Sequence, residues 1–431
     1  MKNFLKKTIS KFNIPISILV IVLLSVSVIH FNFFDSKTKI YEKYPNLSLR
    51  KHLFKSEPIR NNLLNDYNVK FLPYTQFFKV KLNKIKLIFD KEYYSREKNS
   101  DTSISYSKWG TFFIEMQNNI LFVSDYLGNI YYVNDLDKKI NSGEKELKLN
   151  KIETNINPQR VFDIFLKDNK LYIAYSTYEN GCRKINISFS DLNTKKLKFK
   201  KFFNPDVCSK TGAIGRMQFY NHKGRQGILA SIGEGVHDKP GKNSQNDTSV
   251  FGKIIFIQLD DLKYIIYSKG HRVVQGLYAE KNLILASEHG PKGGDEINKI
   301  LFGKNYGWPI ASYGERYDFN YEKKPFYKKN HESLGFEEPV YVSPHGLGIS
   351  EILMVPKKFS NFFFKNFLFV TSLNGRSIYL ANLDKNFSRI ISMEKIFLNE
   401  RIRDIKYYEK LNSILLAFEE NGEIGILKSQ N

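Results

Sequence analysis

The amino-acid sequence repeats one short pattern six times. In each repeat, a run of four apolar or small residues follows a turn rich in Asn, Asp, Lys or Gly. The runs are Leu121–Ser124, Leu171–Ala174, Ile228–Ser231, Ile284–Ser287, Leu368–Thr371 and Ile414–Ala417. Four of the five intervals between their first residues are 46 to 57 residues long, and one is 84. Strand–turn–strand units that recur at about 50 residues are typical of a β-propeller. The sequence therefore predicts an all-β, six-bladed β-propeller rather than a large β-sandwich.

The one long interval predicts an insertion of about 30 residues in one repeat. It falls roughly between Glu288 and Pro339 and contains Gly, Pro, Trp and Tyr rather than low-complexity polar sequence. Long loops inside compact repeats are usually functional or disordered. Because this composition is that of an ordered segment, we expect an ordered loop at one mouth of the propeller.

A single long apolar run lies near the N-terminus. No Asp, Glu, Lys or Arg occurs between Lys11 and Asp35, and four lysines, Lys11 included, precede the run without any acid. At 1.5 Å per residue its roughly 23 residues extend about 34 Å, enough to cross a bilayer core. The charge bias predicts a cytoplasmic N-terminus and an exported remainder. We expect a Lys-rich cytoplasmic tip and transmembrane signal-anchor helix over 1–35, a tether over 36–75 and the propeller over 76–431, on the periplasmic or extracytoplasmic side of the membrane.

A cleaved signal peptide is the alternative interpretation of this run. The run is long for a signal peptide, and residues 30–34 (HFNFF) offer no small-residue cleavage site. Cys182 and Cys208 agree with export, because cysteines pair in oxidising compartments. A disulfide between them and two free buried thiols are both open at this point.

The net charge is the next clue to a partner. Lys and Arg number 66 against 44 Asp and Glu, a formal net charge of +22. Such a charge can indicate nucleic acid, anionic lipid or an acidic partner. However, the sequence shows no zinc-ligand spacing, no arginine-rich helix and no aromatic–basic RNA-binding signature. The 15% of aromatic residues excludes a disordered chain. We therefore expect a globular protein that binds no nucleic acid.

The insertion opens with a turn whose residues suit a cation. Residues 287–298 read SEHGPKGGDEIN, and NYGWP follows at 305–309. Gly-Pro and Gly-Gly favour a tight turn with exposed backbone carbonyls, and Asp295 and Glu296 place carboxylates beside it. Carbonyl and carboxylate oxygens are ligands that Ca²⁺ prefers. The spacing is consistent with a calcium site, and also with a plain turn that carries a solvated acidic pair.

The stretch from Glu288 to Pro309 resembles the signature of the glucose/sorbosone dehydrogenase family, which includes soluble quinoprotein glucose dehydrogenases and aldose sugar dehydrogenases. Further matching elements occur in the family's order: Gly233-Glu234, Gln245-Asn246-Asp247, Gly252-Lys253-Ile254, Gly270-His271-Arg272, Gln275-Gly276-Leu277, Ser372-Leu373-Asn374 and Arg401-Ile402-Arg403-Asp404. The resemblance covers roughly residues 76 to 427. It implies a six-bladed propeller that uses pyrroloquinoline quinone (PQQ) and calcium to oxidise an aldose or a related small alcohol, with a protein as a possible electron acceptor.

The resemblance also implies roles for individual residues. The carbonyls of Gly290 and Pro291 match the positions that hold the cofactor's calcium, and Asp295 matches an acid that faces the cofactor. Glu296 and Tyr306 match positions that help to bind structural calcium. The residues that match the arginines holding the quinone's carboxylates are Arg272, Arg401 and Arg403. Guanidinium groups suit this task because they bind carboxylates through two parallel hydrogen bonds; the alternative for each is a surface ion pair.

Three positions depart from the family's pattern. Gly212, in the stretch GAIGR at 212–216, stands where the family has a histidine that takes the proton from the sugar hydroxyl. Val273 stands at an asparagine position and Asn374 at a lysine position near the cofactor. General-base catalysis contributes about 10²–10⁴-fold in rate, so an active enzyme needs a substitute base. The histidines that could supply it are His237, His289 and His345.

Two hypotheses follow from these matches and departures. The first is a membrane-anchored, extracytoplasmic quinoprotein sugar dehydrogenase that uses a base from outside the family's pattern. The second is a catalytically inactive propeller of the same family that binds a glycan or a protein, because a fold does not fix a function. The signature and the three arginines favour the first hypothesis, and Gly212, Val273 and Asn374 favour the second.

Overall fold

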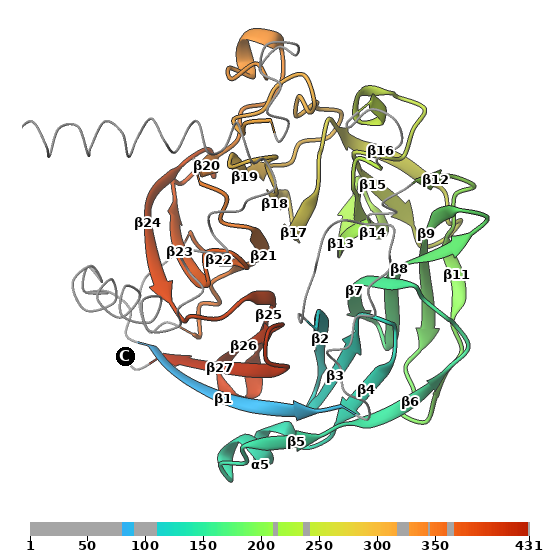
Figure 1. The fold of residues 1–431 in the computed structure, drawn as a ribbon, viewed down its shortest axis with the longest axis vertical. Coiled ribbons are helices and arrows are strands. Elements are labelled where there is room, and N and C mark those ends of the chain that lie inside the picture. The colour runs from blue at the N-terminus through green and yellow to red at the C-terminus, as the bar shows by residue number, and fades with distance from the viewer. Residues whose placement is uncertain are drawn as a thin grey trace, which may run out of the picture. The chain divides into compact units, whose positions relative to one another are not determined.

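The computed structural model describes residues 80–89, 110–209, 214–235, 242–316, 327–343, 345–359 and 366–429. Strands within these residues form six sheets, and Figure 1 shows these sheets ranged around a common axis. The prediction of an all-β, six-bladed propeller is therefore confirmed. The predicted membrane helix and tether, residues 1–75, lie outside the described residues. None of the helices that the structure describes is long and apolar enough to cross a membrane.

The six sheets are numbered here as blades 1 to 6, in the chain order of their innermost strands. Blade 1 contains β2 (Phe112–Gln117), β3 (Ile120–Asp125), β4 (Ile130–Val133), β6 (Asn150–Thr154) and β10 (Lys196–Leu197). Blade 2 contains β7 (Arg160–Lys167), β8 (Lys170–Glu179), β9 (Cys182–Asp191), β11 (Lys200–Phe203) and β12 (Cys208–Ser209). Blade 3 contains β13 (Ile214–His222), β14 (Arg225–Ile232), β15 (Lys253–Gln258) and β16 (Tyr264–Lys269).

The second half of the ring follows the same order. Blade 4 contains β17 (Val274–Glu280), β18 (Leu283–Glu288), β19 (Asp295–Lys299) and β20 (Tyr341–Ser343). Blade 5 contains β21 (Ile349–Met354), β22 (Phe367–Ser372), β23 (Ser377–Leu383) and β24 (Ile390–Phe397). Blade 6 contains β25 (Ile402–Tyr408), β26 (Ser413–Phe418), β27 (Glu423–Ser429), β1 (Val80–Ile88) and β5 (Glu146–Lys148). The described helices are α5 (Leu136–Asn141) and the 3₁₀ turns η1 (Lys242–Gln245), η2 (Glu332–Leu334) and η3 (Glu409–Leu411).

All six predicted apolar runs form the second strand of a blade, namely β3, β8, β14, β18, β22 and β26. These runs are continuously apolar because a blade is covered on both faces. In β3, Leu121 and Val123 pack in the cluster between blades 6 and 1, whereas Phe122 packs between blades 1 and 2. Each pair of consecutive blades encloses one such hydrophobic cluster. The core is therefore a ring of six interfaces, in which each fully buried Phe, Leu or Val contributes about 1.5–3 kcal/mol.

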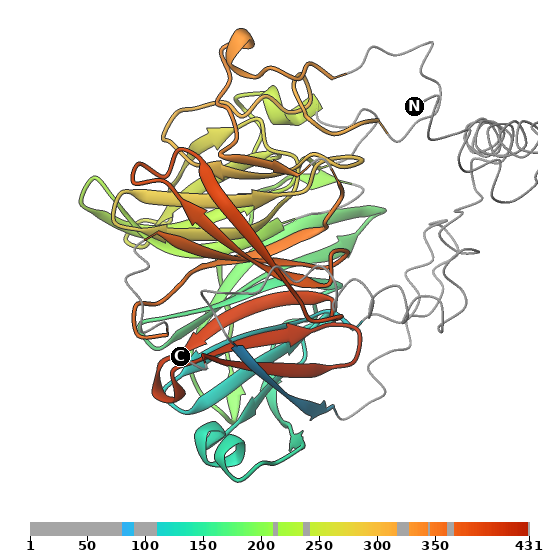
Figure 2. The same ribbon diagram turned by 90° about the vertical axis from the view of Figure 1, so that its left-hand side faces the viewer.

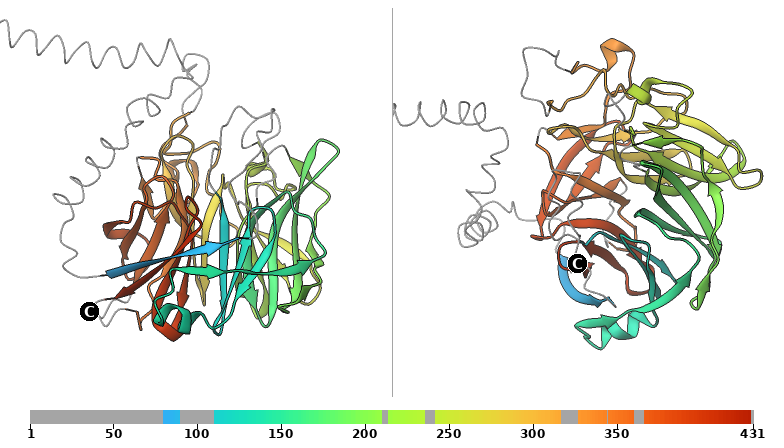
Figure 3. Two further views of the ribbon diagram at one scale, coloured as in Figure 1. Left: turned by 60° about the horizontal axis from the view of Figure 1, so that its bottom comes forward. Right: turned by 45° about the vertical axis from the view of Figure 1, so that its right-hand side comes forward.

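Blade 6 combines the two ends of the described chain. Strand β1 pairs antiparallel with β27, from Val80 opposite Ser429 to Lys86 opposite Glu423, and Figure 3 shows β1 in blue beside the red C-terminal strands. Leu87 of β1 is buried in the cluster between blades 6 and 1. This pairing closes the ring, so that an N-terminal strand completes the sheet formed by the last three strands.

The insertion in blade 4 has a different extent from the predicted one. The prediction of one loop from Glu288 to Pro339 was wrong in this respect, because β19 lies within that range and pairs with β18. The hairpin turn at 289–294 is therefore separate from the inserted segment, which runs from 300 to 340 between β19 and β20. Its described part is seen in orange at the top of Figure 2.

The two cysteines form a disulfide that joins Cys182 of β9 to Cys208 of β12. The disulfide therefore excludes the alternative of two free buried thiols. It fixes the outer edge of blade 2 immediately before the chain enters blade 3.

Candidate functional site

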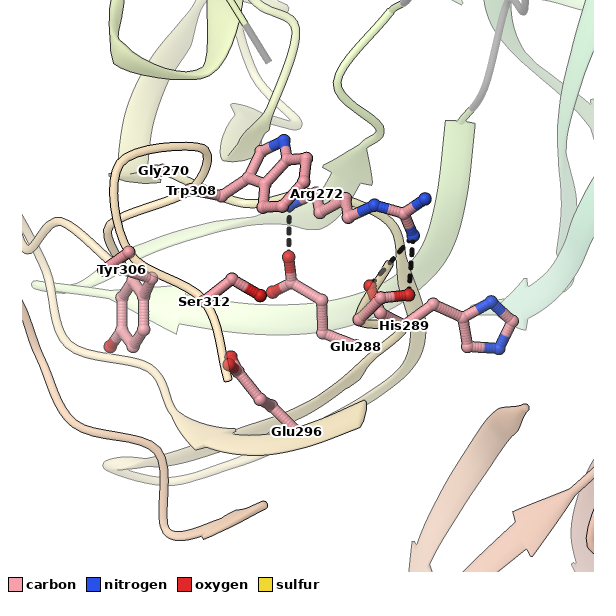
Figure 4. Close-up of a pocket in the computed structure, with 10 residues that line it drawn as sticks. Gly270, Arg272, Glu288, His289, Glu296, Tyr306, Trp308 and Ser312 are labelled. Atoms are coloured by element: carbon pink, nitrogen blue, oxygen red, sulfur yellow. Dashed lines mark hydrogen bonds between the residues drawn. The ribbon is translucent and has the colours of Figure 1, made fainter. Parts of the chain in front are cut away.

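The turn at 289–294 and the segments that lead into β17 and β25 lie at the same end of the propeller. Successive strands of a blade are antiparallel, so the turn between its second and third strands is at the same end as the entry to its first strand. We call this end the signature mouth, defined by the 289–294 turn, Arg272, and Arg401 with Arg403. Figure 4 shows the part of it around Arg272.

Arg272 precedes β17 and reaches the turn of the same blade. Its Nη1 donates hydrogen bonds to the carbonyl oxygens of His289, at 3.1 Å, and of Gly290, at 3.0 Å. Its guanidinium carbon lies 5.3 Å from the ring centre of Trp308, and its Nε lies 3.8 Å from a carboxylate oxygen of Glu234. Figure 4 shows the guanidinium directed at the two carbonyls. The side chain is 17% exposed, so it is held mainly by the protein itself.

Arg401 and Arg403 share one buried acceptor. Arg401 donates to Oε1 of Glu419 through Nε at 3.0 Å and Nη2 at 2.9 Å, and Arg403 donates to Oε2 through Nε at 2.8 Å. Nη1 of Arg403 also donates to the side-chain oxygen of Gln275 at 3.1 Å. Burial alone would raise the pKa of Glu419, but Arg403 and Arg401 hold that pKa below its usual value. Glu419 is therefore an anion at neutral pH that fixes two guanidinium groups side by side.

His289 lies close to Arg272 and Arg403, whose charges act on its imidazole. Its Nε2 is buried and accepts or donates no hydrogen bond among the described residues. Burial lowers the pKa of the imidazole, Asp295 opposes this effect, and the positive charges of Arg272 and Arg403 lower the pKa further. The ring is therefore neutral near pH 7, because burial and the two arginine charges both disfavour a third positive charge here.

Asp295 supports the turn from below. One carboxylate oxygen accepts the backbone N–H of Gly290 at 3.1 Å, and the other accepts the backbone N–H of Ile349 at 3.3 Å. The side chain is 3% exposed. Asp295 thus joins the 289–294 turn to the first strand of blade 5, which places His289 against the entry to that blade.

A small cavity of about 10 Å³ lies behind Arg272, and it has room for about one water molecule. Its lining includes Glu288, Glu296 and Tyr306, which are drawn in Figure 4. Burial, and then the charge of Glu288, raises the pKa of Glu296 to about 8. Beside it, Oδ1 of Asn298 is buried without a hydrogen-bond partner among the described residues. Two buried carboxyl groups thus line the cavity, with an unsatisfied amide oxygen beside one of them, but no group of three or more His, Cys, Asp or Glu side chains placed to hold a metal ion occurs among the described residues.

The predicted ligand Tyr306 contributes to this cavity less directly. Its ring stacks on His271 at 4.7 Å between centres. Its hydroxyl donates to the carbonyl of Lys299 at 2.6 Å and accepts the N–H of Leu301 at 2.9 Å. The hydroxyl is therefore engaged with backbone groups, and only the main chain of Tyr306 remains suited to a metal.

The remaining predicted residues have different outcomes. Gly212 and His237 lie outside the described residues, so the predictions made for them remain predictions. His345 is exposed, unlike His289. Asn374 donates to the carbonyl of Gly346 at 2.7 Å. Pro291 is buried in the 289–294 turn. The structure thus brings Arg272, His289, Gly290, Asp295 and Arg403 together and leaves His345 at the surface.

Sequence reasoning missed the acids that hold the arginines. Glu419 and Glu234 lie 16 or more residues from the arginines that they contact. It also missed that Arg216 lies beneath the site, donating to the carbonyl of Gln275 at 2.9 Å and that of Arg403 at 2.6 Å. One signal for these residues was available in the sequence, namely a charged residue beside an apolar run. Arg216 lies near the start of β13, and Glu419 directly follows β26.

Comparison with known proteins identifies the family. The sequence profile described as glucose/sorbosone dehydrogenase matches residues 109–427. This chain belongs to the glucose/sorbosone dehydrogenase family. An uncharacterised protein of Synechocystis sp. is 30% identical over 226 residues, 47% of this chain and 53% of that protein. The chain thus spans about half the length of this relative. The aldose sugar dehydrogenase YliI of Escherichia coli is 25% identical over 285 residues, 60% of this chain and 73% of that protein.

Solved structures of the glucose/sorbosone dehydrogenase kind share the fold. The soluble aldose sugar dehydrogenase of Escherichia coli in its apo form superposes with a TM-score of 0.61 at 18% identity, over 82% of this chain and 99% of that one. The PQQ-bound aldose sugar dehydrogenase of Streptomyces coelicolor gives a TM-score of 0.52 at 18% identity, over 82% and 99%. At these identities the likeness supports the propeller fold.

Proposed function

We propose that this protein is a quinoprotein-type sugar dehydrogenase that oxidises an aldose or a related small alcohol at the signature mouth. The observation that carries this proposal is that Arg272 and Arg403 both lie close to a neutral His289, while Arg401 is bound to the same glutamate as Arg403. Three guanidinium groups at one mouth attract an anion, and Glu419 compensates only part of their charge. A relative described as an aldose sugar dehydrogenase and a structural neighbour described as PQQ-bound support the same substrate and cofactor class.

The donor set fits a polycarboxylate. Arg401 and Arg403 are 12% and 13% exposed, so each keeps one edge at the mouth while Glu419 holds it from behind. Nη2 of Arg403 has no hydrogen bond among the described residues, whereas its Nε and Nη1 are bound to Glu419 and Gln275. Buried acids that orient an arginine pair in this way reduce the entropy lost when an anion binds. The arginines would hold the carboxylates of PQQ, which when bound supplies the oxidant for the sugar carbon.

His289 is the residue that we assign to take the proton of the sugar hydroxyl. Its Nε2 lacks a partner among the described residues, whereas the exposed His345 sits away from the arginine pair. Burial, together with the charges of Arg272 and Arg403, keeps the imidazole uncharged, so one of its nitrogens carries a lone pair for the proton. This assignment compensates for Gly212, which stands at the family's histidine position and cannot accept a proton.

The proposal includes one structural calcium site, at Glu296. Glu296, with Glu288 and Asn298 beside it, offers the oxygen atoms that Ca²⁺ prefers. Of Gly290 and Pro291, the other predicted calcium ligands, the Gly290 carbonyl is considered in the next section, because Arg272 already donates to it. Anchoring by residues 1–35, with the propeller on the extracytoplasmic side and electrons leaving to a protein acceptor, completes the proposal and rests on the sequence alone.

A second function, ligand binding without catalysis, is favoured by two features of the site. Gly212 and the capture of the Gly290 carbonyl by Arg272 both alter the part of the site that handles reacting atoms. An inactive propeller that still binds an anionic glycan or protein through Arg401 and Arg403 agrees with these two features. It predicts ligand binding without turnover.

One experiment separates the two functions. The full-length protein in detergent is mixed with PQQ and Ca²⁺, and binding is followed by fluorescence while a redox dye reports the oxidation of a panel of aldoses. We expect saturable PQQ binding, dye reduction by at least one sugar, and loss of reduction in His289→Asn with PQQ binding retained. Arg225→Met is the matched control, because Arg225 pairs with Gln258 at the opposite end of blade 3. Binding of PQQ without any turnover would establish the second function, and absence of both would reject the proposal.

A further inference from the structure

The guanidinium of Arg272 occupies the place at which a metal ion would meet the 289–294 turn. Its Nη1 lies 3.1 Å from the oxygen of His289 and 3.0 Å from that of Gly290, two successive carbonyls of one turn. Figure 4 shows both bonds arising from the same nitrogen. Carbonyl oxygens that converge in this way form a cation site, and the cation present here is a side chain.

Three further groups hold that side chain in place. The indole of Trp308 lies 5.3 Å below the guanidinium carbon, a distance at which cation–π attraction acts. Glu234 lies 3.8 Å from Nε, and it accepts the indole N–H of Trp308 at 2.8 Å, so these two partners are tied to one another. The backbone N–H of Arg272 is bound to Glu288. Displacing the guanidinium would therefore break two hydrogen bonds, a cation–π contact and an ion-pair contact together.

The surroundings offer little to a competing Ca²⁺ ion. Calcium takes six to eight oxygen ligands, and it could not share the Gly290 oxygen with a guanidinium 3.0 Å away, because both are cations. The nearest acid of the turn, Asp295, already accepts a backbone N–H on each of its oxygens. The described groups at this turn thus fit a resident guanidinium and do not fit calcium at the same time.

We propose that Arg272 is the resident cation of the 289–294 turn, and that ligands bind at the signature mouth without calcium at the Gly290 carbonyl. Arg272 then supplies, from within the chain, the positive charge that the resemblance would assign to a metal ion. The proposal concerns the cation of the mouth, and it holds whether the ligand is PQQ or another carboxylate. For the proposed dehydrogenase, it means that PQQ affinity does not require Ca²⁺.

The test uses Tb³⁺, which binds calcium sites and emits when a nearby tryptophan is excited. Trp308 lies close enough to serve as the sensitiser for a metal at this turn. All proteins carry Glu296→Gln, so that the carboxyl group of Glu296, which lines the adjoining cavity together with Arg272 and Gly290, does not contribute a ligand. The full-length protein with Arg272 is compared with Arg272→Met, which keeps a stem over the indole but has no donor or charge, and with Arg272→Ala in case one variant fails to fold. Arg225→Met is the control.

We expect no saturable tryptophan-sensitised emission with Arg272 present, and saturable emission that Ca²⁺ competes away in Arg272→Met, corresponding to at least tenfold tighter binding. Equal Tb³⁺ affinity with and without Arg272 would overturn the proposal, because calcium would then reach the turn despite the guanidinium. Absence of binding in both Arg272 variants would also overturn it, because the carbonyls would then not form a cation site. A PQQ titration in EGTA, expected to differ less than twofold from that in Ca²⁺, is independent of turnover. Failure of the dehydrogenase function therefore does not affect the Tb³⁺ result.

Discussion

Replacement of Arg216 by methionine tests whether the propeller depends on a buried charge network at its centre. Arg216 is 3% exposed; its Nη1 donates to Asp163 on β7 at 2.9 Å, and its Nε lies 2.9 Å from a carboxylate oxygen of Glu351 on β21. It also lies 3.5 Å from Asp404 on β25, and the buried Lys406 acts on the same three carboxyl groups. These residues come from the innermost strands of four blades, so one guanidinium joins blades that are distant in the sequence. Methionine retains the volume and removes every donor.

The expected cost follows from what the variant leaves behind. Removing one partner of a buried ion pair costs about 3–5 kcal/mol, because the other charge stays buried and uncompensated. Here three carboxyl groups lose their guanidinium partner and keep only the charge of Lys406, and the carbonyls of Gln275 and Arg403 lose a donor as well. We therefore expect Arg216→Met to destabilise the protein by at least about 3–5 kcal/mol at pH 7. This corresponds to a fall in Tm of the order of 5–10 °C.

Urea unfolding followed by tryptophan fluorescence measures this effect at pH 7. The matched control is Lys196→Met, which removes a pair of similar length, 2.6 Å to Glu153, whose side chains are 44% and 65% exposed. We expect this control to cost less than about 1 kcal/mol. If Arg216→Met cost no more than the control, the network would not hold the blades together and the argument from burial would be refuted. Arg216→Lys, which keeps the charge without the fork, should fall between the two.

Four further outcomes are expected. Burial raises the pKa of Glu115 from 4.5 to about 7, so its contribution to stability is complete below about pH 4.5 and is lost as the pH rises through 7; Glu115→Gln should flatten the pH dependence of Tm over that interval. Replacing Cys182 and Cys208 by serine, which opens a loop with a sequence separation of 26, should cost about 3–4 kcal/mol in urea unfolding. Leu87→Ala, in the strand that closes blade 6, should cost about 2–5 kcal/mol by the same assay, and a cost below 1 would refute its role in closure. Arg403→Met should weaken PQQ binding about 10- to 100-fold, and unchanged affinity would place the quinone elsewhere.

The blade pattern could be predicted from sequence because each second strand is buried on both faces. Leu121 and Phe122 are neighbours in the chain, yet they pack against different blades. Such strands are short, continuously apolar and bounded by turns, and a propeller repeats them at a constant spacing. The signal is therefore local and recurs six times. The insertion was misjudged for a related reason: β19 is short and carries Asp295 and Glu296, so its pairing with β18 left no apolar trace.

The pairing of charged residues could not be predicted from the sequence. Arg216 contacts the Arg403 carbonyl across 187 positions, and Glu115 contacts Lys406 across 291. Such contacts exist only once the ring has closed, and no local pattern specifies which charge will face which. The same holds for Glu419, whose two arginine partners are identified by their positions in the family's pattern but whose own role depends on the fold.

The departures from the family's pattern affect both the handling of reacting atoms and the binding of the cofactor, but they leave the arginine pair unchanged. The arginine pair that would hold carboxylates is present, and Glu419 fixes both arginines from behind, although Val273 and Asn374 depart from the pattern near the cofactor. The part of the mouth that would handle reacting atoms differs twice, since Gly212 removes a base and Arg272 occupies the Gly290 carbonyl. Anion binding and bond chemistry rest on different residues here, so one can persist while the other changes. A protein altered in this way should bind its ligand through the arginine pair even if it does not turn over a sugar. The binding assay is therefore more informative than the activity assay.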